Sequence, residues 1–367
     1  HIPFCKKACN YCNFHFSTQQ KWRPQMITCL QKELQMRTSY LNTTIQSVYF
    51  GGGTPSLLIE AELQSLLNTV IENYPIAANA EITLEANPDD MNEEKLVSWQ
   101  KLGINRLSIG VQSFREADLQ WMNRAHTADE ALKSIQLAQQ IGFQNLSIDL
   151  IYGTPGLTNE AWHANVQQAL DLGIPHLSCY ALTVEPKTAL DKQIKTGKLP
   201  NIVTDEQAEH FDILLNTLTN AGFEQYEIAN FAIPGFRSKH NSSYWAYEPY
   251  VGIGPSAHSF NQISRQWNIA NNALYMKTIE NNELPFEIEY LTEVQQLNEY
   301  LMLKLRTIEG CNMAFIAQKW GNKLHERIMK KAKPYLQEDY AILQGNNLVL
   351  TAKGKFLADG IAAALFE

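Results

Sequence analysis

Residues 1–16 read HIPFCKKACNYCNFHF, so Cys5, Cys9 and Cys12 place three thiols on one short loop. Three thiolates can bind three irons of a [4Fe–4S] cluster and leave the fourth iron open. Structural zinc takes four ligands, so a zinc site here would have to recruit His1 or His15. The aromatic residues around the thiols favour a shielded [4Fe–4S] cluster, with zinc and a metal-free set of thiols as the alternatives.

The composition is that of an ordinary globular protein, with 45% hydrophobic and 19% charged residues. A chain of 367 residues exceeds the size of a single core, so we expect a large domain and a smaller one. There is no export signal and no apolar run long enough to span a bilayer, which predicts a cytoplasmic protein and leaves contact with a membrane surface open. The net charge of −8 opposes binding to phosphate backbones, so nucleic acid is not an expected partner. Because the sequence begins at His1 without a methionine, we expect further residues before it.

Short β-branched runs alternate with helical stretches through the first 225 residues. This alternation predicts a parallel sheet, in which right-handed crossovers bring the carboxyl ends of all strands to one face. Six strand–helix units would form an incomplete (β/α)6 TIM-like barrel of the α/β class. The predicted strands are Ser47–Phe50, Glu81–Ala86, Arg106–Val111, Leu146–Tyr152 and Leu177–Leu182, with His1–Pro3 ending an earlier one, and the predicted helices cover 21–38, 57–73, 92–102, 127–141, 158–171 and 204–221.

We expect three parts along the chain. Residues 1–225 form the barrel, and residues 226–290 form a turn-rich connecting segment that packs on it. Residues 291–367 form a mostly helical C-terminal domain. Two apolar runs around a Gly-Asn-Asn turn follow its predicted helices and are typical of a winged-helix-like module; the helices are expected at 292–306, 312–320 and 324–336.

Glycines and polar side chains gather where the predicted strands end. The glycines of Gly51–Pro55 allow a ligand to approach the backbone, and their N–H groups can face an amino acid bound to the open iron, although a plain tight turn is the alternative. Glu85 and Asp149 are suited to accept hydrogen bonds from ribose hydroxyls or an ammonium group, or are paired structural charges. Gln112 and Arg124 are binding residues or ordinary loop residues, and Arg124 could clamp a carboxylate.

The Cys-x3-Cys-x2-Cys loop, with Tyr11 before its last cysteine, resembles the signature of the radical SAM superfamily. The resemblance narrows to the family of oxygen-independent coproporphyrinogen III oxidase and the related HemW heme chaperones. The segments that carry it are His1–Cys5, Gly51–Pro55, Arg106–Phe114, Arg124-x-His126, Gly252–His258 and His240-Asn241-Ser242-Ser243-Tyr244-Trp245. The last segment matches a His-Asn-x-x-Tyr-Trp motif of the chaperones, and Phe14 stands where the oxidases carry a further cysteine.

This resemblance implies a [4Fe–4S] cluster on the three cysteines, S-adenosylmethionine (SAM) at the open iron, and heme. The residues implied for SAM are Tyr11, Gly52, Gly53, Thr54, Glu85, Gln112, Arg124, Asp149, Ala181 and His258. For heme we expect His240 as the axial ligand and Tyr244 and Trp245 as stacking partners, with His126 and His258 as rival ligands. A capped turn or a satisfied surface residue is the alternative reading of His240.

The expected function is therefore that of a heme chaperone, which binds heme and delivers it to an unknown acceptor protein, with a reductant serving the cluster. The enzymatic alternative is oxidative decarboxylation of coproporphyrinogen III, against which Phe14 argues. A zinc-stabilised scaffold that mediates protein contacts is the third hypothesis. No catalytic residue is assigned.

Overall fold

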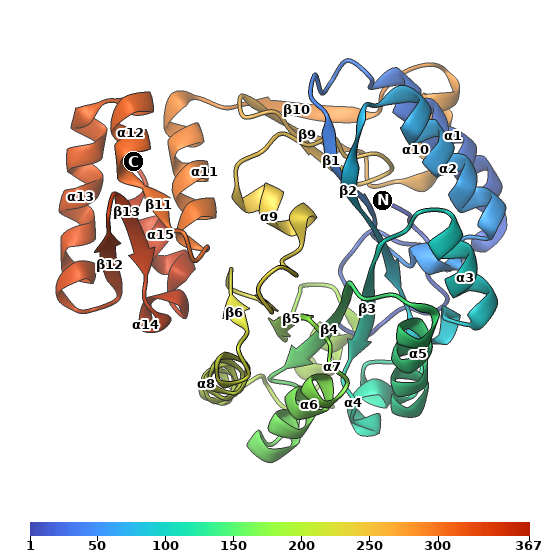
Figure 1. The fold of residues 1–367 in the computed structure, drawn as a ribbon, viewed down its shortest axis with the longest axis horizontal. Coiled ribbons are helices and arrows are strands. Elements are labelled where there is room, and N and C mark those ends of the chain that lie inside the picture. The colour runs from blue at the N-terminus through green and yellow to red at the C-terminus, as the bar shows by residue number, and fades with distance from the viewer.

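A computed structural model describes residues 1–367. Its main sheet contains five parallel strands, each beside the strand that precedes it in the chain (Figure 1). This order follows from helical crossovers that return each strand to the same starting edge. The five strands are β1 (Ile45–Phe50), β2 (Ile76–Ala86), β3 (Arg106–Gln112), β4 (Leu146–Tyr152) and β5 (His176–Ala181).

The two ends of the sheet differ from the six repeated units that the sequence predicts. In place of a strand ending at His1–Pro3, Ile2 forms a single parallel bridge with Gly52, because the chain turns into the cysteine loop two residues later. Beyond β5 the sheet continues with antiparallel strands β7 (Asn230–Ala232) and β6 (Glu224–Gln225). The fold is nevertheless the expected open α/β barrel.

Helices cover the outer face of the parallel strands, and the predicted ones lie close to their expected positions. Helix α5 shows why: Thr127 caps its first turn, Gly142 ends it at φ +110°, and Ala131, Ile135 and Ala138 form its buried stripe. The barrel helices are α1 (Arg23–Met36), α2 (Glu60–Asn73), α3 (Glu93–Lys101), α4 (Glu116–Trp121), α5 (Ala128–Ile141), α6 (Asn159–Asp171), α7 (Ala189–Lys195) and α8 (Thr204–Asn220).

Residues between the barrel and the C-terminal region pack in both directions. Helix α10 (Asn272–Glu280) lies against α1 and contributes to the barrel core, whereas Tyr247 and Phe260 belong to the core of the C-terminal helices. Helix α9 (Lys239–Trp245) lies between the two cores, where it contacts β1 and α11 (Figure 1). A three-stranded antiparallel sheet completes this region with β8 (His258–Phe260), β9 (Ser264–Asn268) and β10 (Phe286–Tyr290).

The C-terminal region combines helices with a small antiparallel sheet, as a winged-helix-like module does. Its strand order is β11-β13-β12. None of the helices in the protein has the length and apolar composition needed to cross a membrane. The elements of this region are α11 (Glu293–Leu305), β11 (Cys311–Asn312), α12 (Met313–Trp320), α13 (Asn322–Gln337), β12 (Ala341–Gln344), β13 (Asn347–Leu350), α14 (Ala352–Lys355) and α15 (Ala358–Leu365).

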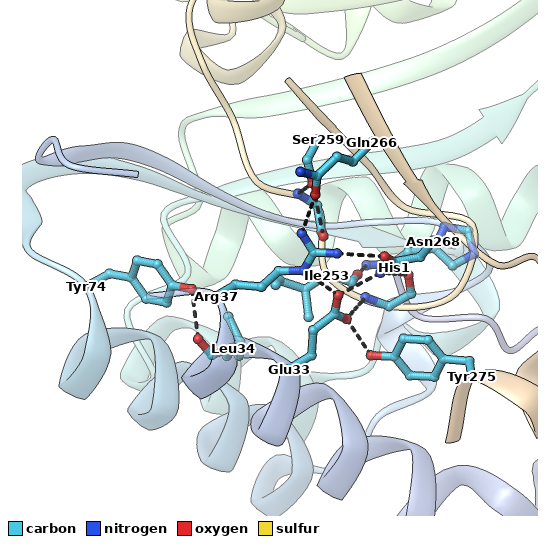
Figure 2. A network of polar contacts seen from close by, with 12 residues as sticks. His1, Glu33, Leu34, Arg37, Tyr74, Ile253, Ser259, Gln266, Asn268 and Tyr275 are labelled. Carbon is cyan, nitrogen blue, oxygen red and sulfur yellow. Dashed lines mark hydrogen bonds and ion pairs between the residues drawn. The ribbon is translucent and has the colours of Figure 1, made fainter. Parts of the chain in front are cut away.

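A buried polar network fastens the 253–268 segment to helix α1 (Figure 2). Glu33, 0% exposed, accepts from Arg37 Nε (2.8 Å), the Gly254 N–H (2.7 Å), Asn268 Nδ2 (2.7 Å) and Tyr275 Oη (2.5 Å). The Arg37 guanidinium also donates to Asn268 Oδ1 at 2.8 Å. Because the carboxylate is ion-paired and hydrogen-bonded on both oxygens, its burial is compensated.

We expect Arg37→Met to destabilise the protein by about 3–5 kcal/mol, because it leaves the Glu33 carboxylate buried without its cation. Chemical denaturation measures the loss. The matched control is Lys133→Met, which removes an exposed pair with Asp129 and should cost under about 1 kcal/mol. Equal, small losses in the two variants would contradict the role given to this network.

Candidate functional site

A cavity of about 460 Å³ opens at the carboxyl ends of the parallel strands. This volume is in the usual range for one small-molecule ligand. The structure gathers there the three cysteines and every residue implied for SAM except His258. The predicted residues that line it are Cys5, Cys9, Tyr11, Cys12, Gly52, Gly53, Thr54, Glu85, Gln112, Arg124, Asp149 and Ala181.

The cysteine loop has little regular structure of its own and is held by backbone pairing. Cys5 N–H donates to Ser17 O at 3.0 Å, and Cys12 N–H donates to Cys9 O at 3.3 Å. All three thiols are free and partly exposed to the cavity. Arg124 Nη1 donates to Cys9 Sγ at 3.3 Å, which brings a positive charge beside the sulfurs.

The chemistry of the three sulfurs fits a cluster. Burial raises the pKa of the Cys5 thiol to about 11 and also raises that of Cys12, so a cation is needed to hold them as thiolates. No three His, Cys, Asp or Glu side chains converge closely enough to hold one ion. Three thiolates on one loop are one ligand short of a structural zinc site and are sufficient for three irons of a cluster.

Gly52 occupies a position that excludes a side chain. Its φ is +116°, and an added Cβ would lie 2.5 Å from Nδ1 of His1. The His1 ring in turn reaches His15 O at 2.8 Å through Nε2. The glycine therefore lets the N-terminal segment pack on the turn and supports the cysteine loop.

The N–H groups of the glycine turn do not face the cavity ligand, contrary to expectation. They donate inside the protein, and the pairs are Gly52 N to Glu85 Oε2 (3.0 Å), Gly53 N to Ile2 O (2.9 Å) and Thr54 N to Phe4 O (2.7 Å). These donors fasten the N-terminal segment to the sheet. What the turn can offer a ligand is carbonyl oxygen, which suits a cation such as an ammonium group.

Two partly buried carboxyl groups give the cavity its acidic character. Glu85 accepts from Tyr49 Oη at 2.7 Å and from the Gly52 N–H, and burial raises its pKa. Burial and the nearby Glu85 charge raise the pKa of Asp149 to about 7. A cationic ligand would relieve both charges.

Arg124 and Gln112 are fixed from the neighbouring strands. Arg124 Nη2 donates to Asn87 Oδ1 and to Gly110 O, both at 2.7 Å, while its Nε is buried without a partner. Gln112 has φ +68° at an irregularity in the pairing of β3 with β4, which turns it into the cavity. Backbone strain in a residue of this type is typical of functional sites. His126 lies nearby, buried, with Nε2 in reach of Val111 O at 3.1 Å.

A second cavity, of about 750 Å³, runs along the free edge of β1. His240, Tyr244 and His258 line it, whereas Trp245 lies outside both cavities with the Arg306 guanidinium 5.7 Å above its ring. The structure therefore separates His258 from the other residues implied for SAM and groups it with those implied for heme.

Both ring nitrogens of His240 are already engaged. Nδ1 shares a hydrogen bond with Ser47 Oγ and Nε2 with Tyr244 Oη, both at 2.9 Å. Its ring stacks on Tyr49, with centroids 4.5 Å apart and planes 16° from parallel. Burial lowers the pKa of His240 to about 4, so the imidazole is neutral, as a metal ligand must be.

Tyr49 and Asn241 also line the first cavity, and the sequence did not place either of them there. Strand periodicity gives a signal for Tyr49, because it lies two residues before the glycine turn that follows β1 and alternation turns it to the same side as that turn. Asn241 belongs to the His-Asn-x-x-Tyr-Trp motif, but its place in the first cavity depends on how α9 packs against β1 and has no sequence signal.

The fold and the cysteine-lined cavity define a radical SAM protein. The Radical SAM superfamily profile matches residues 1–169, and the HemN C-terminal domain profile matches residues 291–357. A solved structure of coproporphyrinogen III oxidase (HemN) from Escherichia coli covers 100% of this chain and 88% of its own, with TM-score 0.87 and 23% identity. That likeness establishes the shared fold.

Curated relatives narrow the assignment. Heme chaperone HemW of Bacillus subtilis is 32% identical over 99% of this chain and 97% of its own length. Heme chaperone HemW of Escherichia coli is 38% identical over 70% of this chain and 68% of its own. The chain belongs to the HemW heme chaperone family of radical SAM proteins.

We expect Asp149→Asn to stabilise the ligand-free protein more at about pH 8 than at about pH 5. A carboxyl whose pKa is raised from 3.8 to about 7 binds more protons folded than unfolded, so the wild-type chain loses stability as pH rises through that window. The difference between the two pH values should be on the order of 2–3 kcal/mol, measured by denaturant titration. An equal effect at both would contradict the assigned burial of this charge.

Replacement of one cluster cysteine gives a direct test of the metal. After anaerobic reconstitution, the wild-type protein should hold about four irons with matching sulfide, and Cys9→Ser should lose most of both. Metal analysis and visible absorption measure the content. Cys29→Ser, which changes a buried core cysteine, is the control and should keep its iron. One zinc per chain in the wild type would support the scaffold hypothesis instead.

Proposed function

We propose that this protein is a heme chaperone that holds a [4Fe–4S] cluster and SAM in the first cavity, binds heme near α9 and delivers it to an acceptor protein. The observation that carries the proposal is full-length similarity to proteins named heme chaperone, together with the His240–Trp245 motif. The acceptor, the reductant of the cluster and the cytoplasmic location stay predictions.

In this proposal different residues of the chain bind different parts of SAM. A bound [4Fe–4S] cluster would supply electron transfer to SAM at its open iron. Glu85, Asp149 and the carbonyl oxygens of the glycine turn are suited to the ammonium and ribose hydroxyls. Arg124 is suited to the carboxylate, because its buried Nε has no partner within the protein.

Heme ligation by His240 requires one local change. Its Nε2 must leave Tyr244 Oη before it can bind iron, while the bond of Nδ1 to Ser47 can remain and orient the ring. The basic residues beside the motif are engaged, since Arg237 pairs with Glu224 and Glu309 and Lys239 Nζ donates to Asn79 O at 2.7 Å. Either must exchange a partner to bind a heme propionate.

The alternative function, coproporphyrinogen III oxidation, is favoured by the close match of the fold to HemN. Phe14 argues against it. This side chain lies at the cavity wall and is 68% exposed, and it cannot supply the additional sulfur that the resemblance associates with the oxidases.

A heme titration tests the proposal. We expect a Soret band on adding heme to the reconstituted protein, with apparent affinity reduced at least about tenfold in His240→Ala because an axial ligand is lost. His163→Ala, an exposed histidine on α6, is the matched control and should bind as the wild type does.

The same preparation should leave coproporphyrinogen III unchanged in an anaerobic assay with SAM and reductant. Rapid conversion would replace the chaperone proposal with the oxidase. An unaltered Soret band in His240→Ala would move the ligand assignment to His258 or His126.

A further inference from the structure

One side chain, Tyr49, forms a wall shared by the two cavities. Tyr49 and Gly52 are among the residues that line both the first cavity, with the cysteines, and the second cavity, with His240. Tyr49 lies on β1, where Ser47 and Tyr49 share one face of the strand. A change on either side of this wall must therefore act on the same phenol ring.

On the side of the first cavity, Tyr49 is tied to a residue implied for SAM. Its hydroxyl donates to Glu85 Oε1 at 2.7 Å, and Glu85 Oε2 accepts from the Gly52 N–H. The two carboxylate oxygens still have unused lone pairs, so a cationic ligand can bind Glu85 without displacing Tyr49.

On the side of the second cavity, the Tyr49 ring stacks on His240. Stacking and the bonds to Ser47 and Tyr244 fix the orientation of the imidazole, and Tyr244 packs edge-on against Tyr250 at 4.6 Å. The contacts from Glu85 through Tyr49 to His240 are thus continuous and direct.

We propose that Tyr49 is a positioning residue that couples the SAM site to the heme motif, so that bound SAM strengthens heme binding at α9. The inference rests on the proposed heme-chaperone function and names a regulation of that same site. It concerns binding and involves no bond-breaking step.

The direction follows from the contacts. A cationic ligand bound to Glu85 restricts the motion of this carboxylate, which also accepts a hydrogen bond from the Tyr49 hydroxyl at 2.7 Å. The phenol ring is then held more firmly against His240. An imidazole that is already oriented loses less freedom on binding iron, so heme binds more tightly.

The test is a set of heme titrations of the reconstituted full chain, with and without saturating SAM. In the wild type, SAM should lower the heme Kd at least about five-fold, within the usual range of coupling between sites. Thermodynamic reciprocity requires heme to lower the SAM Kd by the same factor. Tyr49→Phe keeps the stacked ring and removes the bond to Glu85. The ratio of heme Kd values without and with SAM should therefore fall towards one in this variant.

The control is Tyr180→Phe, which alters another tyrosine of the first cavity that makes neither the bond to Glu85 nor the stacking on His240 and should preserve the full factor. A role limited to local stability would weaken heme binding equally with and without SAM. If SAM does not change the heme Kd of the wild type, or if Tyr49→Phe keeps the full factor, the proposed coupling is wrong. Neither result would affect the heme-chaperone proposal. Absence of any Soret band in the wild type would overturn the heme proposal itself. If Tyr49→Phe fails to fold, the reciprocal wild-type titrations decide the question.

Discussion

The site depends on backbone pairing between the N-terminal segment and the turn after β1. The cysteine loop contains no helix or strand that could position its sulfurs. It is placed by the bonds of Ile2 and Phe4 to the glycine turn and of Cys5 to Ser17. Glycine is required in this turn because the His1 ring packs directly on Gly52. The sulfurs therefore lie at the carboxyl ends of the strands, where the other cavity residues gather.

This arrangement determines which groups are left to recognise a ligand. The N–H donors of the turn are consumed in holding the loop, so anions have few backbone donors there. The cavity retains partly buried carboxyl groups at Glu85 and Asp149, with Arg124 beside Cys9. SAM carries an ammonium group, a sulfonium group and one carboxylate, and these charges are complementary to those of the cavity.

Much of the barrel could be predicted, because its strands are β-branched runs bounded by Gly or Pro and its helices have regular apolar stripes. The sequence could not predict β2 from Ile76, since residues 77–80 are alanines and one asparagine with low strand propensity, and the pairing of Ile76 with Ile45 is a contact between distant segments. Helix α9 was missed because its start depends on Ser238 capping Asn241 N–H and on the Glu81 carboxylate, not on apolar periodicity. The cavity residues near a motif were found, whereas the stacking of Tyr49 on His240 joins distant segments and leaves no local pattern.

Charge gives a physical reason for two separate ligand sites. Heme carries two propionate carboxylates, and the first cavity already contains two partly buried carboxyl groups whose pKa values are raised by desolvation. Adding further negative charge there would cost more than binding a cation, so we expect heme to stay outside this cavity. The second cavity, on the His240 side of Tyr49, offers a neutral imidazole and aromatic rings, which suit an iron porphyrin. Communication between the two ligands must then pass through the wall, where Tyr49 contacts a carboxylate on one side and an imidazole on the other.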